Sequence, residues 1–223
     1  MQSSKQKAPT AQMQEIQEMD KWQIYQEKAL HFYAKGEKIP MLGPGIWQVA
    51  QGLVQLSTLY PTGEDGLLGW VGPSMCFSPS FSCMQTYQAK ALSHVHLMWF
   101  SLREVETTPH LAEEMFPQLM RRLRQVEAML AIAGQRRVED RIVQLLMLLK
   151  QEMGQSVNEG TRLMVRLTHQ EIASAIGTSR VTVTRILGKL RKEGAIALDA
   201  KRHIIIKDCQ FQSMMDCSVL REF

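Results

Sequence analysis

The sequence predicts an α+β fold with an N-terminal β-roll, a long helix and a C-terminal winged helix-turn-helix. Residues 30–104 carry short apolar runs between Gly and Pro residues, a pattern typical of jelly rolls and small barrels. Residues 109–153 instead carry apolar side chains at helical spacing. Residues 168–206 combine two short helical patterns with two β-prone runs around a polar turn, which is typical of a winged helix.

The N-terminal half is expected to form strands separated by tight turns. The runs with strand character are Ala29–Tyr33, Ile46–Ala50, Leu53–Leu59, Leu67–Val71, Thr86–Leu92 and His96–Phe100. Gly and Pro between them favour turns. A barrel of this size can enclose one small ligand.

A long helix is expected to follow, beginning at Thr108-Pro109, with a restart at Pro117. Its apolar residues alternate in steps of three and four, as in a coiled-coil seam: Phe116, Leu119, Leu123, Val126, Leu130 and Ala133. Such a stripe could pack on the barrel or join two copies of the chain. Gly134 ends this helix, and we expect a second amphipathic helix over Arg136–Met153 and a strand over Leu163–Leu167.

Residues 168–192 predict two short helices joined by a tight turn. Gly177 can supply the positive φ that a sharp helix–helix turn needs, and Ser179 is a good N-cap. The second helix has an apolar stripe opposite a polar face that carries Arg180, Thr184, Arg185 and Lys189. An apolar back and a basic front are what a recognition helix in a DNA major groove requires. The alternative for this segment alone is an ordinary amphipathic hairpin.

The residues around this helix pair favour DNA binding. Ala195–Leu198 and His203–Ile206 predict a β-hairpin whose tip carries Lys201 and Arg202. Residues 161–207 hold ten Lys/Arg against three Asp/Glu, a net of +7, although the whole chain is only +4. Residues 1–120 hold eight against eleven, a net of −3. Positive charge gathered on one module indicates a polyanionic partner.

Composition argues against several other classes of protein. No apolar run is long enough to span a bilayer, and the first residues lack a signal-peptide core, so we expect a cytoplasmic protein without membrane contact. The four cysteines (Cys76, Cys83, Cys209 and Cys217) lack metal-ligand spacing, so neither a metal nor another cofactor is expected. Nothing resembles a catalytic triad, a paired-carboxylate cleft or a phosphate-binding glycine loop, so we expect no enzyme.

The order of β-roll, long helix, hinge and winged helix resembles the cyclic AMP receptor protein/FNR superfamily of bacterial transcription regulators, whose roll is of the cyclic-nucleotide-binding type. Leu167–Gly177 and Ser179–Arg191 look most like the cyanobacterial global nitrogen regulator, as does the spacing of Arg122, Gln125 and Glu127. The resemblance implies a homodimeric, sequence-specific DNA-binding transcription regulator that reads a pseudo-palindromic operator through residues 179–192.

Carried over to this sequence, the resemblance implies that Arg180, Val181 and Arg185 face base edges. Arginine commonly reads guanine, and valine can meet a thymine methyl. The residues implied to lie near phosphates are His169, Gln170, Thr178, Ser179, Thr182 and Thr184, with Lys189 on the same helix and Lys201 and Arg202 on the hairpin.

The effector site departs from the family pattern. Cyclic-nucleotide binders of the superfamily carry a Gly-Glu pair and then an Arg-Ser/Thr, but Gly69–Met84 contains neither Glu nor Arg, so we expect no cyclic AMP binding. In the nitrogen regulator the positions of Arg122 and Glu127 help to hold 2-oxoglutarate, but its barrel arginine is Gln85 here. A different ligand, or none, is therefore preferred, with Gly69, Trp70, Val71, Arg122 and Glu127 as the effector-binding candidates. Plain helix-surface charge is the alternative for Arg122 and Glu127.

These inferences divide the chain into a flexible tail (1–22), a β-roll sensor-like domain (23–108), a dimerisation helix (109–134) and a winged helix-turn-helix domain with a C-terminal extension (135–223). The expected partners are double-stranded DNA, a second copy of the chain and RNA polymerase, and a small-molecule effector or a co-activator protein is left open. The alternative function is a ligand-sensing or protein-interaction module whose winged helix contacts protein.

Overall fold

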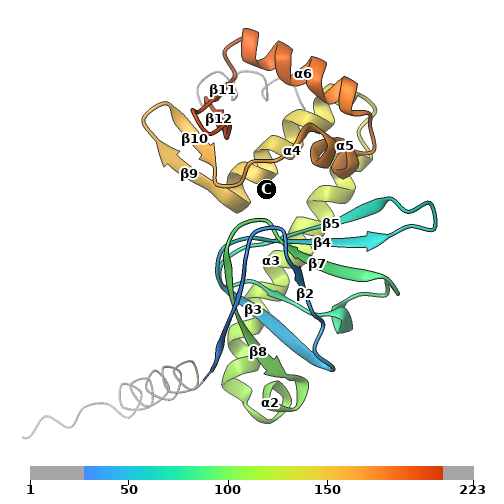
Figure 1. Ribbon diagram of the computed structural model, residues 1–223, viewed down its shortest axis with the longest axis vertical. Helices are drawn as coiled ribbons and strands as arrows, with labels where there is room; N and C mark the ends of the chain where they lie inside the picture. Colours follow the sequence, from blue (N-terminus) through green and yellow to red (C-terminus); the bar gives the residue numbers. More distant parts are fainter. Residues whose placement is uncertain (1–27, 208–223) are drawn as a thin grey trace, which may run out of the picture.

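The structure is a computed structural model that describes residues 28–207, and it confirms the predicted fold class (Figure 1). A β-roll and a winged helix-turn-helix lie at opposite ends of the molecule, and helix α3 runs between them. The predicted tail over 1–22, the extension over 208–223, and Cys209 and Cys217 lie outside the described residues.

Two four-stranded antiparallel sheets form the β-roll. One has the order β1-β8-β3-β6 and the other β2-β7-β4-β5. Their strands are β1 (Leu30–Tyr33), β2 (Lys38–Ile39), β3 (Gly45–Gln51), β4 (Val54–Leu59), β5 (Asp65–Val71), β6 (Cys76–Phe77), β7 (Tyr87–Ala91) and β8 (Val95–Ser101), with a 3-10 turn at Pro79–Phe81. Each expected run overlaps one of these strands, although the limits differ by a residue or two. The sequence did not indicate β2 and β6, because two residues are too few to show alternation.

Apolar side chains fill the interior of the roll. Trp47, Val54, Val71 and Leu97 are fully buried there. The Trp47 ring meets Trp99 edge-on at 4.9 Å, and its Nε1 donates to the carbonyl oxygen of Pro40 at 3.1 Å. The pleat places these alternate residues inward, as sandwich packing requires.

Two helices leave the roll, α2 (Leu102–Thr107) and α3 (Pro109–Ala133). A capping box between Ser101 and Glu104 starts α2. The predicted restart at Pro117 is wrong, because α3 runs through Pro117 without a break. A proline there removes one backbone hydrogen bond, and burial of Met115 before it and Ala128 after it holds both parts of the helix against the rest of the protein.

The two long faces of α3 differ. Leu111, Met115, Ala128 and Ile132 are buried within the chain. The predicted seam lies on the other face, where Phe116 is 63% and Leu130 74% exposed, and Leu123, Val126 and Ala133 are also exposed while Leu119 is half-buried. The seam therefore does not pack on the chain's own roll.

Up to residue 207, the C-terminal unit contains three helices and a small antiparallel sheet of order β11-β12-β10-β9. Its elements are α4 (Val138–Met153), β9 (Gly154–Val157), β10 (Gly160–Leu163), α5 (His169–Ile176), α6 (Arg180–Lys192), β11 (Ile196–Leu198) and β12 (Ile204–Ile206). The hairpin β11–β12 with its turn at 199–203 is the wing. The predicted strand over Leu163–Leu167 is wrong, because the strand ends at Leu163, the last residue that pairs with β9.

One apolar cluster joins this unit to the rest of the molecule. It contains Ile142 and Leu146 of α4, Leu53 and Trp70 of the roll, and Ile132 of α3, and it continues into α5 and α6. Among the described residues, no helix is long and apolar enough to cross a membrane.

The turn between α5 and α6 gives a stability prediction. Gly177 has φ 64° and ψ 52°, and a Cβ there would meet nothing within 4 Å. Gly177→Ala should lower the free energy of unfolding by about 1–2 kcal/mol through backbone strain alone. Gly188→Ala, inside α6 and equally free of contacts, should raise it by roughly 0.5–1 kcal/mol. Urea denaturation at a fixed protein concentration measures both, and effects of the same sign would contradict the strain argument.

Candidate DNA-binding surface

Local hydrogen bonds define where the two short helices begin. The Thr168 hydroxyl accepts from the Glu171 backbone N–H at 3.2 Å, and the Glu171 carboxylate accepts from the Thr168 backbone N–H at 2.6 Å. The Ser179 hydroxyl accepts from the Thr182 backbone N–H at 3.2 Å. These caps satisfy N–H groups that a helix start leaves unpaired, so both helix starts are encoded within a few residues of sequence.

One side of helix α6 packs against the rest of the domain, and the opposite side is exposed to solvent. Val183, Ile186, Leu187 and Leu190 form its buried side. Val181 is 77% exposed, and Arg180, Thr184 and Arg185 are also exposed. Val181 and Arg185 are four residues apart, so they share the outward crest of the helix.

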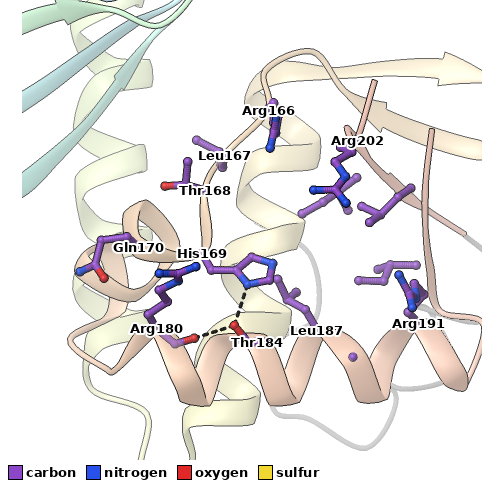
Figure 2. Close-up of a pocket in the computed structure, with 14 residues that line it drawn as sticks. Arg166, Leu167, Thr168, His169, Gln170, Arg180, Thr184, Leu187, Arg191 and Arg202 are labelled. Carbon is purple, nitrogen blue, oxygen red and sulfur yellow. Dashed lines mark hydrogen bonds between the residues drawn. The ribbon is translucent and has the colours of Figure 1, made fainter. Parts of the chain in front are cut away.

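A hollow of about 740 Å³ lies between α6, the start of α5 and the wing (Figure 2). Arg166, Arg180, Arg191 and Arg202 line it from three separate segments, and we call it the arginine hollow. Within residues 28–207, no Asp or Glu lines it. Guanidinium groups gathered without acidic neighbours suit a phosphate.

His169 enters this hollow at the end of a short hydrogen-bond chain. Its Nδ1 lies 2.7 Å from the Thr184 hydroxyl, which donates to the carbonyl oxygen of Arg180 at 2.9 Å (Figure 2). The single hydroxyl hydrogen is used in that bond, so His169 Nδ1 is the donor to Thr184. Nε2 therefore carries a lone pair when the ring is neutral. Burial, and then the charge of Arg180, lower the pKa of His169.

The other candidate DNA contacts occupy three places. Gln170 lines the arginine hollow. Thr178, Ser179 and Thr182 lie at the start of α6, where the Ser179 and Thr182 hydroxyls are 2.9 Å apart. Lys201 is exposed in the wing turn.

Lys189 lies apart from the hollow. It is nine residues after Arg180, half a turn away around the helix. Its Nζ is 2.6 Å from a Glu139 carboxylate oxygen on α4 and 3.9 Å from Glu193. The hydrogen bond to Glu139 raises the pKa of Lys189. A DNA contact by Lys189 would have to replace this carboxylate with a phosphate.

Sequence reasoning missed two arginines of the hollow as individual contacts. Arg191 follows Arg180 by eleven residues, about three turns, so helical spacing alone places both on one face. Arg166 lies outside any helix or strand, and only the tertiary structure brings it to the hollow.

The effector candidates are only partly brought together. Gly69, Trp70 and Val71 lie on β5 facing α3, and Gly69 has φ 137°. A Cβ there would come within 2.3 Å of Arg122 Nη1, so the backbone approaches the guanidinium closely. Glu127 is exposed, two residues beyond the buried Gln125, so one protomer does not pair Glu127 with Arg122.

Arg122 is tied to the roll rather than free on the helix surface. Its Nη2 donates to the carbonyl oxygen of Leu68 at 2.6 Å and its Nη1 to Gln125 Oε1 at 2.5 Å. Gln125 Oε1 also accepts from the Trp70 backbone N–H at 3.0 Å. Burial lowers the pKa of Arg122, so the surface-charge alternative is wrong for this residue.

Comparisons with known proteins agree with this geometry. Residues 140–210 match the model of the Crp-like helix-turn-helix domain. The chain is 35% identical over 154 residues to the Regulatory protein CysR of Synechococcus elongatus, covering 68% of this chain and 71% of that protein. It is 31% identical over 166 residues to the Global nitrogen regulator of Synechocystis, covering 70% and 74%. The chain belongs to the CRP/FNR family.

A solved structure supports the fold over most of the length. TTHB099, a CRP-family transcriptional regulator from Thermus thermophilus, matches with a TM-score of 0.67 at 25% identity, covering 83% of this chain and 95% of that chain. The predicted resemblance to the cyanobacterial nitrogen regulator is confirmed, and CysR is a comparable relative. This CRP/FNR protein is a DNA-binding transcription regulator, and CysR and the Global nitrogen regulator are regulatory proteins.

The His169 geometry predicts that DNA affinity depends on pH. Only the protonated ring offers an N–H at Nε2, so a phosphate in the hollow should raise the pKa of His169 in the complex above its lowered value in the free protein. The complex then binds more protons between the two values. Affinity should rise as the pH falls through the pKa of the complex, and level off below that of the free protein.

Fluorescence anisotropy with a DNA duplex at constant ionic strength measures this dependence. His169→Gln should flatten this rise. His31→Gln, on strand β1 of the roll, is the matched control and should keep the slope. An unchanged slope in His169→Gln would show that the proton binds elsewhere.

Proposed function

We propose that the regulator acts as a homodimer that places two α6 helices in successive major grooves of a pseudo-palindromic operator, about 34 Å apart. The arginine hollow carries this proposal. It lies directly beside α6, and its lining includes four arginines and, among the described residues, no acidic residue. A helix that enters the groove brings Arg166, Arg191 and Arg202 toward the flanking sugar-phosphate strand and leaves Arg180, at the start of α6, for the bases.

Base contacts are proposed for the crest of α6 and its first turn. Arg180, Val181 and Arg185 are exposed there, while the opposite side of the helix is buried. Arginine can donate two hydrogen bonds to guanine, and Val181 can meet a thymine methyl. His169, Gln170, Thr178, Ser179, Thr182 and Thr184 would contact phosphates and set the register.

The α3 seam is proposed as the dimer interface. Phe116, Leu123, Val126 and Leu130 are large apolar side chains, each at least 42% exposed on one protomer. Their heptad spacing suits a two-helix coiled coil. Two-fold packing along α3 would relate the two α6 helices by the same axis that relates the operator half-sites.

The remaining expectations follow from this role. A regulator of transcription acts where the chromosome lies, so the cytoplasm and contact with RNA polymerase are proposed. Cyclic AMP is not proposed as effector, because Gly69–Met84 lacks the acidic and basic residues that would hold it. Arg122 already donates to Leu68 and Gln125, so a roll that works without ligand is preferred. Activation or repression would then be set by operator position.

Selection from a random-sequence duplex library tests the DNA mode. We expect a two-fold-symmetric motif with half-sites one helical turn apart. Arg180→Ala should relax the preference at one position per half-site and cost about 1–3 kcal/mol on the selected site. Lys201→Ala, the matched surface charge, should weaken all sequences alike and reduce the salt slope by about 1. Recovery of unspecific binding alone, with Arg180→Ala unchanged, would refute the proposed readout.

The seam predicts the oligomeric state. Leu123→Glu combined with Leu130→Glu puts two buried carboxylates in the dimer interface, so sedimentation equilibrium should show a monomer with at least tenfold weaker operator binding. Leu30→Glu replaces an equally exposed leucine on β1, 58% exposed, and should leave the dimer intact. A monomeric wild type, or a dimeric double variant, would remove α3 from the interface.

A further inference from the structure

Three side chains form a closed polar cluster behind the wing turn. Arg162 on β10 donates from Nε to Asp199 Oδ2 at 2.7 Å, and its Nη2 lies 2.8 Å from His203 Nδ1, which is also 3.0 Å from Asp199 Oδ2. Asp199 Oδ1 accepts from the His203 backbone N–H at 2.7 Å. The side chains of Arg162, Asp199 and His203 are 26%, 21% and 15% exposed, so most of their surface is used within the domain.

The cluster holds both ends of the turn that carries Arg202. The Asp199 backbone N–H donates to the His203 carbonyl oxygen at 3.0 Å, and the Arg202 N–H donates to the Asp199 carbonyl oxygen at 2.9 Å. Arg202 has φ 64°, a left-handed conformation that costs an L residue energy. Arg202 keeps this conformation because the surrounding hydrogen bonds hold the turn.

Arg202 is the wing's contribution to the arginine hollow. Its side chain lines the hollow across from Arg180 and Arg191 of α6 (Figure 2). Arg162 also lies in the basic segment 161–207, but its guanidinium group contacts Asp199 and His203. Its charge is therefore not available for a direct DNA contact.

The charge state of Asp199 agrees with this role. Partial burial alone would raise its pKa, but the hydrogen bonds from the His203 backbone and from Arg162 outweigh burial and lower the pKa below its ordinary value. The carboxylate stays ionised at neutral pH, and the ion pair with Arg162 persists there.

We propose that Arg162, Asp199 and His203 are positioning residues that hold the wing turn so that Arg202 grips a DNA phosphate in the arginine hollow. They act through Arg202 and not by touching DNA. The inference rests on the DNA-binding mode proposed above. In this view the acidic residue Asp199 contributes to DNA affinity, although its charge alone would repel DNA.

Asp199→Asn gives a test in which the two explanations differ in sign. Removing a negative charge near a polyanion should strengthen binding if net charge alone matters. The positioning role instead predicts affinity weaker by about tenfold, the loss of one charge-assisted phosphate contact. The measurement is fluorescence anisotropy of the full chain on a mixed-sequence duplex at several salt concentrations. The salt slope should fall along with the affinity.

The matched control is Glu159→Gln, an acid of the same domain whose carboxylate lies 3.6 Å from Lys207. It should bind DNA as tightly as the wild type or more tightly. Arg162→Lys keeps the charge but loses the two-pronged donor. It should weaken DNA binding as Asp199→Asn does. If one of these two variants fails to fold, the other still tests the positioning role.

A double-mutant cycle isolates the route through Arg202. In an Arg202→Ala background, Asp199→Asn and Arg162→Lys should have no further effect, whereas in a Lys201→Ala background each should keep its full effect. Unchanged or tighter binding by Asp199→Asn, or a loss that persists without Arg202, would overturn the inference. If Arg180→Ala weakens binding to the selected operator while these variants bind DNA normally, only the positioning role fails. If Arg180→Ala also leaves binding to the selected operator unchanged, the proposed DNA mode fails.

Discussion

Helix α4 buries its apolar face between the β-roll, α3 and the helix pair of the winged unit. Ile142, Leu146 and Leu149 are fully buried there, in one cluster with Trp70 and Ile132. A sixteen-residue helix is marginal alone in water, so this burial orders α4 and places α5 and α6 on it. Arg141 of α4 adds two polar ties, to the carbonyl oxygens of Gln135 at 2.8 Å and Ile176 at 3.1 Å. The orientation of α6 depends on these contacts.

The arginine hollow depends on that scaffold. Its arginines come from separate places in the chain: Arg180 and Arg191 from α6, Arg202 from the wing turn and Arg166 from the segment before α5. One apolar cluster that includes residues of α4, α5, α6 and the wing strands holds these places together. The electrostatic surface is a product of the apolar core beneath it.

The two faces of helix α3 have different surroundings. The inner face is tied to the roll by apolar packing and by the Arg122 hydrogen bonds to Leu68 and Gln125, and Arg121 reaches Glu152 at the end of α4 at 3.0 Å. The outer face keeps the exposed seam. Any change in the roll that moves α3 would therefore act on α4 and on the seam together, which provides a physical connection between the roll and the spacing of two α6 helices.

The sequence by itself determined the features that depend on near neighbours in the chain. Periodicity predicted the longer roll strands and the helices from α3 onward, and the cap at Ser179 and the left-handed Gly177 were readable as residue types. It misjudged Pro117, because tertiary burial outweighed one missing hydrogen bond, and it could not assign β6 or the full extent of the wing sheet. Only the tertiary structure decided that Arg166 joins the hollow, that Lys189 pairs with Glu139, and that Arg162 pairs with Asp199, thirty-seven residues away. Local propensity acts over a few residues, whereas the partner of a long charged side chain is set by packing between distant segments.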